Sequence, residues 1–582
     1  MILKAHFYRN LLTVLRRLSS RFSVAALCVA GCITVFTVFP LSATGASDEP
    51  EQRSGEDQST QQVTITSVVV NRSNIFDDSP LGATTRLPRL QKEINRFHKI
   101  TRESVILREA GVKPGDTVSV ADIEDIERRL RRLGLFSSVS SSLVTTNDGV
   151  ELRIETRDNF SLVAGASGSF LGGVSNLGLT VGERNLFGSG DELLFSTSRT
   201  SQGRFRGSLS YNDLHFFNTD LRANYRLGRT DDGNFFRASL TQPFRLLNSK
   251  RSWTVTTNLA ERETDFYQDG VIVVAVPEDR NTISGGYTWR SGTVEKRYRR
   301  GLLASFTQVD YSEALGALAN TINVPEDNRT LFFGGLLARD TVSRFAKVQG
   351  LDTLEFVQDI TLGSSAELRF GVNFRDESDE SGPNELATAE PDTQIDPTLS
   401  LSLGRSAAVG QNNLLNVRFA ANAVFEERGL RPWSATASLR AFNTTLKKNT
   451  FAFRMDFSTG EDGSDLPVQL TLGEGNGLRG YTLRRFEGRQ RLRLNLESRY
   501  RPGWKLGVVD IGAVGFFDAG FAAPTSDSSP ELRRSIGVGL RIASNAFLGA
   551  RLFRIDVALP LDPPSGENNP SLSLSLGQVF RF

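Results

Sequence analysis

From residue 160 to the end of the chain, polar and apolar residues alternate with a period of two. The alternating segments are about ten residues long and are separated by clusters of Gly, Asn, Asp and Pro. Residues 491–497 alternate leucine with Arg, Arg, Asn and Glu, and residues 571–576 alternate leucine with serine. Because successive side chains of a β-strand point to opposite faces, each segment predicts a strand with one polar and one apolar face.

Two classes of protein contain many strands of this kind. A soluble all-β array would have to bury its apolar faces in a core over roughly 420 residues, without helices and without a repeat of fixed period. A transmembrane β-barrel turns the apolar faces to lipid and the polar faces to its lumen, and its closure leaves no backbone group unpaired in lipid. The pattern therefore favours a transmembrane β-barrel over residues 158–582, with the soluble array as the alternative.

The N-terminus has the organisation of an export signal. Residues 1–21 are basic, residues 22–41 are almost continuously apolar, and residues 43–46 are mostly small. This order predicts a cleaved signal peptide over residues 1–46, followed by a polar, acidic linker over residues 47–62. The alternatives are an uncleaved membrane anchor and lipidation at Cys32.

Charge and residue types exclude several functions. The net charge is +2, but five of the 68 basic residues and none of the 66 acidic residues lie within residues 1–46, so the rest of the chain is slightly acidic. Overall charge therefore gives no support for nucleic-acid binding. Beyond the signal there is no cysteine, and His98 and His215 are the two histidines. We expect no metal site, no cofactor and no enzymatic activity.

Residues 63–157 predict a small α+β domain. Their order of elements is β-α-α-β-β, and Asn147, Asp148 and Gly149 form the turn between the last two strands. Ser119 and Asp122 form a capping box at the start of the second helix, and Gly134 ends it. Nothing in this domain resembles a catalytic site.

A glycine-rich segment near the C-terminus contains one arginine. Gly475, Gly477 and Gly480 formally match the G-x-G-x-x-G pattern of nucleotide-binding proteins, but an alternating segment follows where a helix would be needed. The other interpretation is a tight loop that holds Arg479 inside a lumen, where a guanidinium needs a carboxylate partner. Asp518, and Glu497 on the polar face of the preceding strand, are the candidate partners.

Together these segments resemble the BamA/TamA superfamily, whose members assemble or translocate polypeptides at the outer membrane. The resemblance rests on residues 478–481 (LRGY), residues 516–520 (FFDAG) and the terminal Phe582, in that order. Residues 182–190 (GERNLFGSG) resemble the start of such a barrel. Residues 63–157 resemble a POTRA domain, a small periplasmic domain that receives clients, including residues 130–136 (LRRLGLF).

The resemblance implies a 16-strand barrel whose sixth extracellular loop folds back into the lumen. Arg479 at the tip of this loop would pair with Asp518 and with Glu497. Residues near 160–170 would meet residues 571–582 in a weak seam that can open and accept strands. Phe580 and Phe582 would carry the signal of the C-terminal strand at the membrane interface. The loop motif consists of Gly477, Leu478, Arg479, Gly480 and Tyr481.

Two features depart from the best-known members of that superfamily. This chain has one POTRA-like domain where they have three or five, and it has extra strand-like material between about residues 344 and 460. The count of alternating segments is nearer 20 than 16, so the strand number stays open. We therefore expect a barrel of about 16 strands or more.

The predicted location is the bacterial outer membrane, with the POTRA-like domain in the periplasm. The leading interpretation is an insertase or translocase that acts on unfolded outer-membrane or secreted client proteins and contacts outer-membrane lipids. A periplasmic or inner-membrane protein would be a further partner of the POTRA-like domain. The alternatives are a dedicated exporter of one partner protein and a passive outer-membrane pore.

Overall fold

A computed structural model gives the structure of the chain. It describes residues 62–75, 95–96, 98–246, 249–293, 295–351, 354, 357–377, 393–427, 429–463, 466–506, 509–524, 530–544, 552–564 and 569–581. The predicted signal peptide, almost all of the predicted linker, and Phe582 lie outside the described residues.

The N-terminal domain has the β-α-α-β-β order expected from the sequence. Its three-stranded sheet has the order β2-β5-β4, and β1 and β3 form a separate short pair. Ile126 and Leu130 of the second helix are buried in the core between the helices and the sheet. The elements are β1 (Val63–Thr64), β2 (Ser67–Ser73), α4 (Glu103–Ala110), β3 (Thr117–Val118), α5 (Val120–Arg132), β4 (Phe136–Thr146) and β5 (Gly149–Asp158).

Local sequence signals fix the ends of both helices. The Ser119 hydroxyl accepts a hydrogen bond from the Asp122 backbone N–H, and the Asp122 carboxylate accepts one from the Ser119 backbone, so the predicted capping box is present. Gly111 and Gly134 follow the two helices with φ of +63° and +71°, values that favour glycine. Among the helices of the described residues, none is long and apolar enough to cross a membrane.

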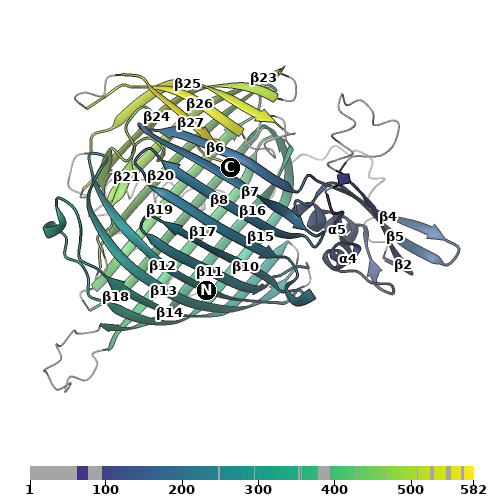
Figure 1. Cartoon of the computed structure of the whole chain (residues 1–582). Helices are drawn as coiled ribbons and strands as arrows, with labels where there is room; N and C mark the ends of the chain where they lie inside the picture. The colour runs from purple at the N-terminus through teal and green to yellow at the C-terminus, as the bar shows by residue number, and fades with distance from the viewer. Residues whose placement is uncertain are drawn as a thin grey trace, which may run out of the picture.

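The rest of the described chain forms a closed barrel of 20 strands, each antiparallel to its neighbours (Figure 1). Its strands are β6 (Leu162–Leu171), β7 (Val174–Leu186), β8 (Asp191–Thr200), β9 (Phe205–Asp213), β10 (Arg222–Thr230), β11 (Gly233–Gln242), β12 (Arg251–Gln268), β13 (Val271–Gly292), β14 (Lys296–Tyr311), β15 (Asn328–Gln349), β16 (Val357–Glu377), β17 (Thr393–Val409), β18 (Asn413–Glu426), β19 (Gly429–Asn443), β20 (Asn449–Glu461), β23 (Gln490–Leu506), β24 (Val509–Ala523), β25 (Arg533–Ser544), β26 (Leu552–Pro560) and β27 (Ser571–Leu576). Short 3-10 turns, η2 (Phe216–Asn218) and η3 (Ala319–Thr321), lie in two connections.

The expectation of about 16 strands or more is confirmed, and the number is 20, above the 16 that the resemblance implies. The extra strand-like material between residues 344 and 460 is part of the barrel wall, in strands β15 to β20. Five strands follow the loop that contains Arg479, as a 16-strand barrel with a sixth external loop would require. The additional strands therefore precede this loop, which becomes the eighth external connection.

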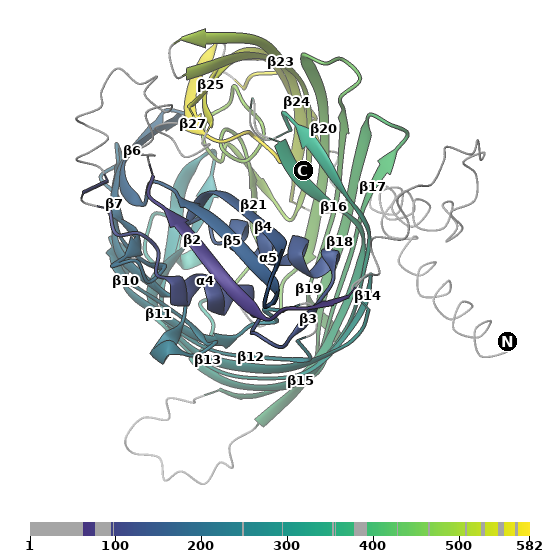
Figure 2. The same ribbon diagram turned by 90° about the vertical axis from the view of Figure 1, so that its right-hand side faces the viewer.

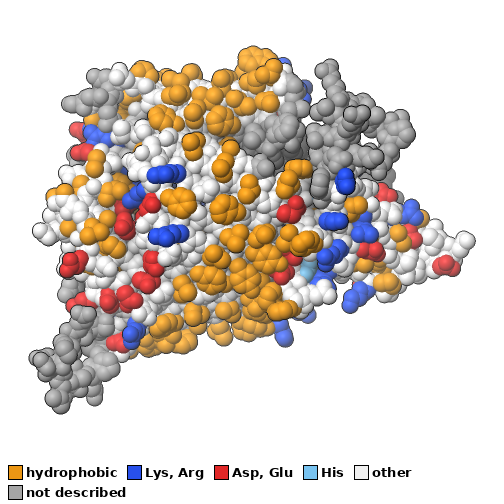
Figure 3. Space-filling view, in the orientation of Figure 1, with side chains coloured by type: hydrophobic (Ala, Val, Ile, Leu, Met, Phe, Trp, Pro, Cys, Tyr) orange, Lys and Arg blue, Asp and Glu red, His pale blue; other side chains and the backbone are white. Residues whose placement is uncertain are grey.

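The two faces of the wall separate as the alternation predicts. On β23 the Leu496 side chain is 49% exposed on the outer face, while its neighbours Asn495 and Glu497 are 0% exposed and point inward. Hydrophobic side chains cover much of the outer wall in Figure 3. An apolar outer wall around a polar interior is the arrangement of a transmembrane barrel.

The POTRA-like domain is seated on the β7–β8 turn and on the start of β10, at one end of the barrel. The backbone N–H of Arg102 donates to the Gly188 carbonyl at 2.8 Å, in the β7–β8 turn. Asn185 Nδ2 donates to Thr101 Oγ1 at 2.9 Å, and Arg222 at the start of β10 pairs with Glu109 of α4 at 3.2 Å. Figure 2 shows the domain in front of the barrel opening. These contacts identify this end of the barrel as the periplasmic end.

Candidate functional site

The segment between β20 and β23 enters the lumen. Its two short strands, β21 (Leu470–Leu472) and β22 (Phe486–Gly488), pair with each other. Gly477 and Gly480 on either side of the tip have φ of +103° and +96°, and a Cβ on Gly480 would lie 3.3 Å from the backbone nitrogen of Pro560. The glycines of the motif therefore serve a tight turn and a close approach to the wall, and no helix follows them.

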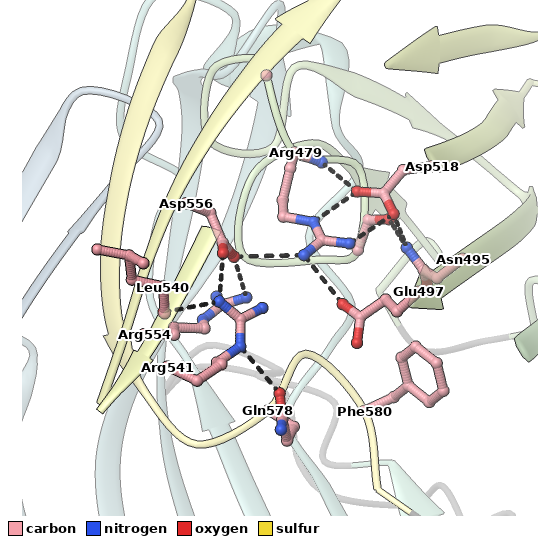
Figure 4. A network of polar contacts seen from close by, with 12 residues as sticks. Arg479, Asn495, Glu497, Asp518, Leu540, Arg541, Arg554, Asp556, Gln578 and Phe580 are labelled. Atoms are coloured by element: carbon pink, nitrogen blue, oxygen red, sulfur yellow. Dashed lines mark hydrogen bonds and ion pairs between the residues drawn. The ribbon is translucent and has the colours of Figure 1, made fainter. Parts of the chain in front are cut away.

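Arg479 lies at the tip of this loop and is 1% exposed (Figure 4). Its Nε and one terminal nitrogen donate to the two oxygens of Asp518 at 2.7 and 2.8 Å. The other terminal nitrogen lies 3.0 Å from Glu497 and 3.3 Å from Asp556. The guanidinium also lies 3.4 Å from the centre of the Phe516 ring. The structure thus brings Arg479 against both carboxylates named from the sequence and against a third.

The third carboxylate, Asp556 on β26, was missed by the sequence reasoning. The signal was available, because Phe553, Ile555 and Val557 alternate with Arg554 and Asp556, which places Asp556 on the polar face. The alternation assigns it to the lumen without saying which lumen residue it meets.

Further arginines surround the site. Arg541 lies 2.5 Å and Arg554 3.3 Å from Asp556, and Arg499 lies 2.8 Å from Glu497. All these side chains are buried. Buried charges are tolerated where they are paired and hydrogen-bonded, and removing one member leaves its partners uncompensated. The arrangement can hold the loop against four neighbouring strands, β23 to β26.

The remaining residues of the loop motif also contact the wall. Leu478 is fully buried and packs with Leu472 and Tyr481, and the Tyr481 hydroxyl donates to the Arg534 carbonyl at 2.8 Å. The Gly477 carbonyl accepts a hydrogen bond from Asn495 at 2.7 Å. Every residue of the motif from 477 to 481 is therefore inside the barrel and in contact.

Glu474 belongs to the same loop and was not singled out by the sequence. One of its oxygens accepts a hydrogen bond from the Gly480 backbone at 3.0 Å, and the other has no hydrogen-bond partner among the described residues. Burial raises the pKa of Glu474 to about 7, although the Gly480 hydrogen bond and two nearby arginines, Arg554 and Arg479, favour the ionised form.

The C-terminal segment differs from the sequence expectation. Strand β27 ends at Leu576, and Gly577, with φ of +83°, turns the chain inward. Phe580 is buried beside Phe442, with ring centres 6.0 Å apart, so its predicted place in the last strand at the membrane interface is wrong. The turn at Gly577 is the reason. Phe582 lies outside the described residues.

Two chains of polar contacts join the loop tip to this C-terminal segment, and Figure 4 draws the second of them. In the first, Glu497 contacts both Arg479 and Arg499, and Arg499 donates to the Phe580 carbonyl at 3.0 Å. In the second, Asp556 contacts both Arg479 and Arg541, and Arg541 donates to the Gln578 side chain at 3.1 Å. The loop and the C-terminal segment are therefore held by one network.

The barrel closes between its first and last strands through a short contact, which we call the seam. β6 pairs with β7 along its whole length, but its pairing with β27 is limited to Phe170 and Leu574 in the described part of the chain. Residues 162–169 of β6 thus have a free edge on this side, at the periplasmic half of the wall. No group of three or more potential metal ligands lies together among the described residues.

Comparisons with known proteins agree with this organisation. Residues 95–157 match the POTRA family model, described as a surface antigen variable number repeat. A 99-residue stretch is 33% identical to outer membrane protein assembly factor BamA of Nitratidesulfovibrio vulgaris and covers 16% of this chain. The match spans 12% of the length of that relative.

Solved structures with a similar trace include BamA of Haemophilus ducreyi lacking POTRA domains 1–3 and CdiB of Acinetobacter baumannii. The first has a TM-score of 0.40 and 13% identity and covers 88% of this chain and 84% of that one. The second has a TM-score of 0.38 and 10% identity and covers 88% of this chain and 74% of that one.

The POTRA match and the closed barrel define a class: a bacterial outer-membrane β-barrel with a periplasmic POTRA domain. Within that class, the stretch that matches BamA makes the chain similar to part of that assembly factor.

Proposed function

We propose that this protein inserts or translocates polypeptides at the outer membrane, without enzymatic chemistry. The observation that carries the proposal is the seam, where one residue pair joins β6 to β27. A backbone edge in lipid has unpaired N–H and C=O groups, so it favours pairing with an incoming strand. The clients would be unfolded outer-membrane or secreted proteins, which supply such strands.

The POTRA domain offers a second edge for client strands. Its sheet has the order β2-β5-β4, so β2 and β4 each have one side without a partner strand among the described residues. Serine occupies five of the eleven positions of β4, which gives this edge little bulk and little charge. An extended client segment could therefore add to β4 by main-chain hydrogen bonds before it reaches the barrel.

The lumen network would control the seam. Arg479 links the loop to Asp518 on β24 and to Asp556 on β26, next to the last strand. The same network holds residues 577–581 in the lumen through Phe580 and Gln578. With the loop in place, β27 is kept short and next to β6. A passive pore would need neither contact.

A reversible seam lock tests the proposal. Residues 47–582 contain no cysteine, so a Phe170→Cys/Leu574→Cys pair would form a disulfide across the seam without competition. We expect the oxidised variant to lose insertion of a barrel client into proteoliposomes and to regain it on reduction. The matched control is Val557→Cys/Leu572→Cys, a pair of facing residues in β26 and β27 that does not cross the seam.

The outcomes separate the candidate functions. Insertion that continues with the seam locked would overturn the proposal. Retained ion conductance together with no client insertion by the wild-type protein would favour the passive pore. Transport of a single secreted partner, without insertion of barrel clients, would favour the dedicated exporter.

A further inference from the structure

The outer wall of the barrel carries two adjoining grooves over β13 to β17. Their volumes are about 670 and 510 Å³, and Ser291, Arg300 and Leu337 line both. The grooves lie far along the barrel from the seam in strand order, and the proposed function does not use them.

The larger groove is apolar, and at its centre the Phe370 ring lies over a glycine, Gly335. Gly335 faces outward between Leu302 of β14 and Phe370 of β16, its two cross-strand partners. Phe333 and Leu337, two residues away on the same face, complete the walls. Leu302, Phe333, Leu337 and Phe370 are all exposed. Such a depression on a wall that faces lipid accepts hydrocarbon chains.

The periplasmic end of the grooves is basic. The turn between β13 and β14 is followed by residues 296–300 (KRYRR), four of which are cationic. Arg300 is paired with Leu337, and Tyr298 with Arg339, so all four side chains are on the outward face. The Arg339 guanidinium lies 6.0 Å from the centre of the Tyr298 ring.

Arg300 and Arg339 have no carboxylate partner in the part of the chain that the structure describes. The nearby acids, Asp340 and Glu367, are on the inward face and are contacted by Arg299 at 3.0 and 3.4 Å. Trp289, the cross-strand partner of Arg300, adds an amphipathic ring of the kind found at membrane interfaces. Two guanidinium groups at the level of lipid headgroups attract phosphate.

We propose that the grooves bind one anionic phospholipid of the periplasmic leaflet. An acyl chain lies along Leu302, Phe333 and Phe370, and the phosphate contacts Arg300 and Arg339. The orientation follows from the position of the arginines at the periplasmic end, which faces the inner leaflet of the outer membrane. This inference is independent of the proposed function, since it concerns the opposite part of the wall.

Tryptophan quenching by brominated lipid tests the site. The chain has four tryptophans, of which Trp289 borders the larger groove and Trp504 is exposed on β23, outside both grooves. Single-tryptophan proteins that keep either one would be placed in phosphatidylcholine vesicles with a minor fraction of dibromo-phosphatidylglycerol. We expect excess quenching of Trp289, corresponding to an enrichment of the anionic lipid of at most about thirtyfold, and quenching of Trp504 at the level of random mixing.

Variants of the groove separate a site from ordinary lipid contact. Arg300→Gln/Arg339→Gln is expected to abolish the excess at Trp289, whereas Arg251→Gln, an outward-facing control beyond the grooves, is expected to preserve it. Gly335→Val would push the Phe370 ring outward into the groove and also lower the excess. Equal quenching at Trp289 and Trp504, or an excess unaffected by the double variant, would overturn the proposal.

Discussion

The ion pair between Arg479 and Asp518 gives the most quantitative prediction. Arg479→Met keeps much of the side-chain volume but leaves three buried carboxylates, on Asp518, Glu497 and Asp556, without their shared cation. Removing one partner of a buried pair typically destabilises a protein by about 3–5 kcal/mol. We expect a loss in this range in the unfolding free energy of the barrel.

A double-mutant cycle isolates the pair itself. Combining Arg479→Met with Asp518→Asn should give a coupling energy of about 2 kcal/mol, since both hydrogen bonds are short and fully buried. The assay is urea unfolding in detergent micelles, followed by intrinsic fluorescence. Exchanging the two charges, with Arg479→Asp and Asp518→Arg, should restore part of the lost stability.

The chain offers a matched control for this cycle. Arg534 and Asp562 form a second two-pronged pair, with distances of 2.8 and 2.7 Å, but Arg534 is 50% exposed. Water and salt screen such a pair, so its coupling should be much smaller. Equal coupling energies in the two cycles would refute the idea that burial strengthens the pair that holds the loop. Additive effects of the Arg479 and Asp518 changes on the unfolding free energy would refute it as well.

Three further predictions concern the loop, the tail and the domain junction. The folded protein retains a proton on Glu474 up to about pH 7, whereas the unfolded chain releases it near pH 4.5. The free energy of unfolding of the barrel should therefore fall by roughly 3 kcal/mol as pH rises through this window. Glu474→Gln should make unfolding curves less dependent on pH, and an unchanged dependence would contradict the assignment. Arg541→Met should release the C-terminal segment, seen as faster hydrogen exchange at residues 577–581, and Arg479→Met should do the same at a distance if one network holds both. Asn185→Ala removes the hydrogen bond that the Asn185 amide donates to the buried Thr101 hydroxyl. The free energy of opening the POTRA–barrel junction should fall by about 1–2 kcal/mol, seen as faster proteolysis there. Unaltered cleavage would show that other contacts suffice.

Features that depend on local pattern could be predicted from the sequence. Alternation in residues 491–497 places Asn495 and Glu497 in the lumen, as observed. The reason is that a strand has two faces, and in a transmembrane barrel one faces lipid and the other faces the polar lumen. The Ser119–Asp122 capping box is also present, because it depends on four consecutive residues. These features need no knowledge of which strands meet.

Features that depend on long-range placement were harder to predict. Asp556 belongs to the site because β26 lies beside β25 and faces the loop, a relation that no spacing in the sequence encodes. The alternation of residues 571–576 predicts a strand that continues toward Phe580. The chain instead turns inward at Gly577, and the Phe580 ring packs beside Phe442. The strand number depends on closure of the whole wall, so a family resemblance gave a value that was too low.

Handling of client polypeptides by the seam can be measured in the cells that contain this protein. The protein would be depleted and complemented by either the wild type or the Phe170→Cys/Leu574→Cys variant, with quantitative proteomics of the outer membrane. We expect several barrel proteins to be lost on depletion, the wild type to restore them, and the locked variant to do so only under reducing conditions. Loss of a single secreted protein would indicate a dedicated exporter instead. An outer-membrane proteome that does not change on depletion would contradict a role of the seam in insertion or translocation.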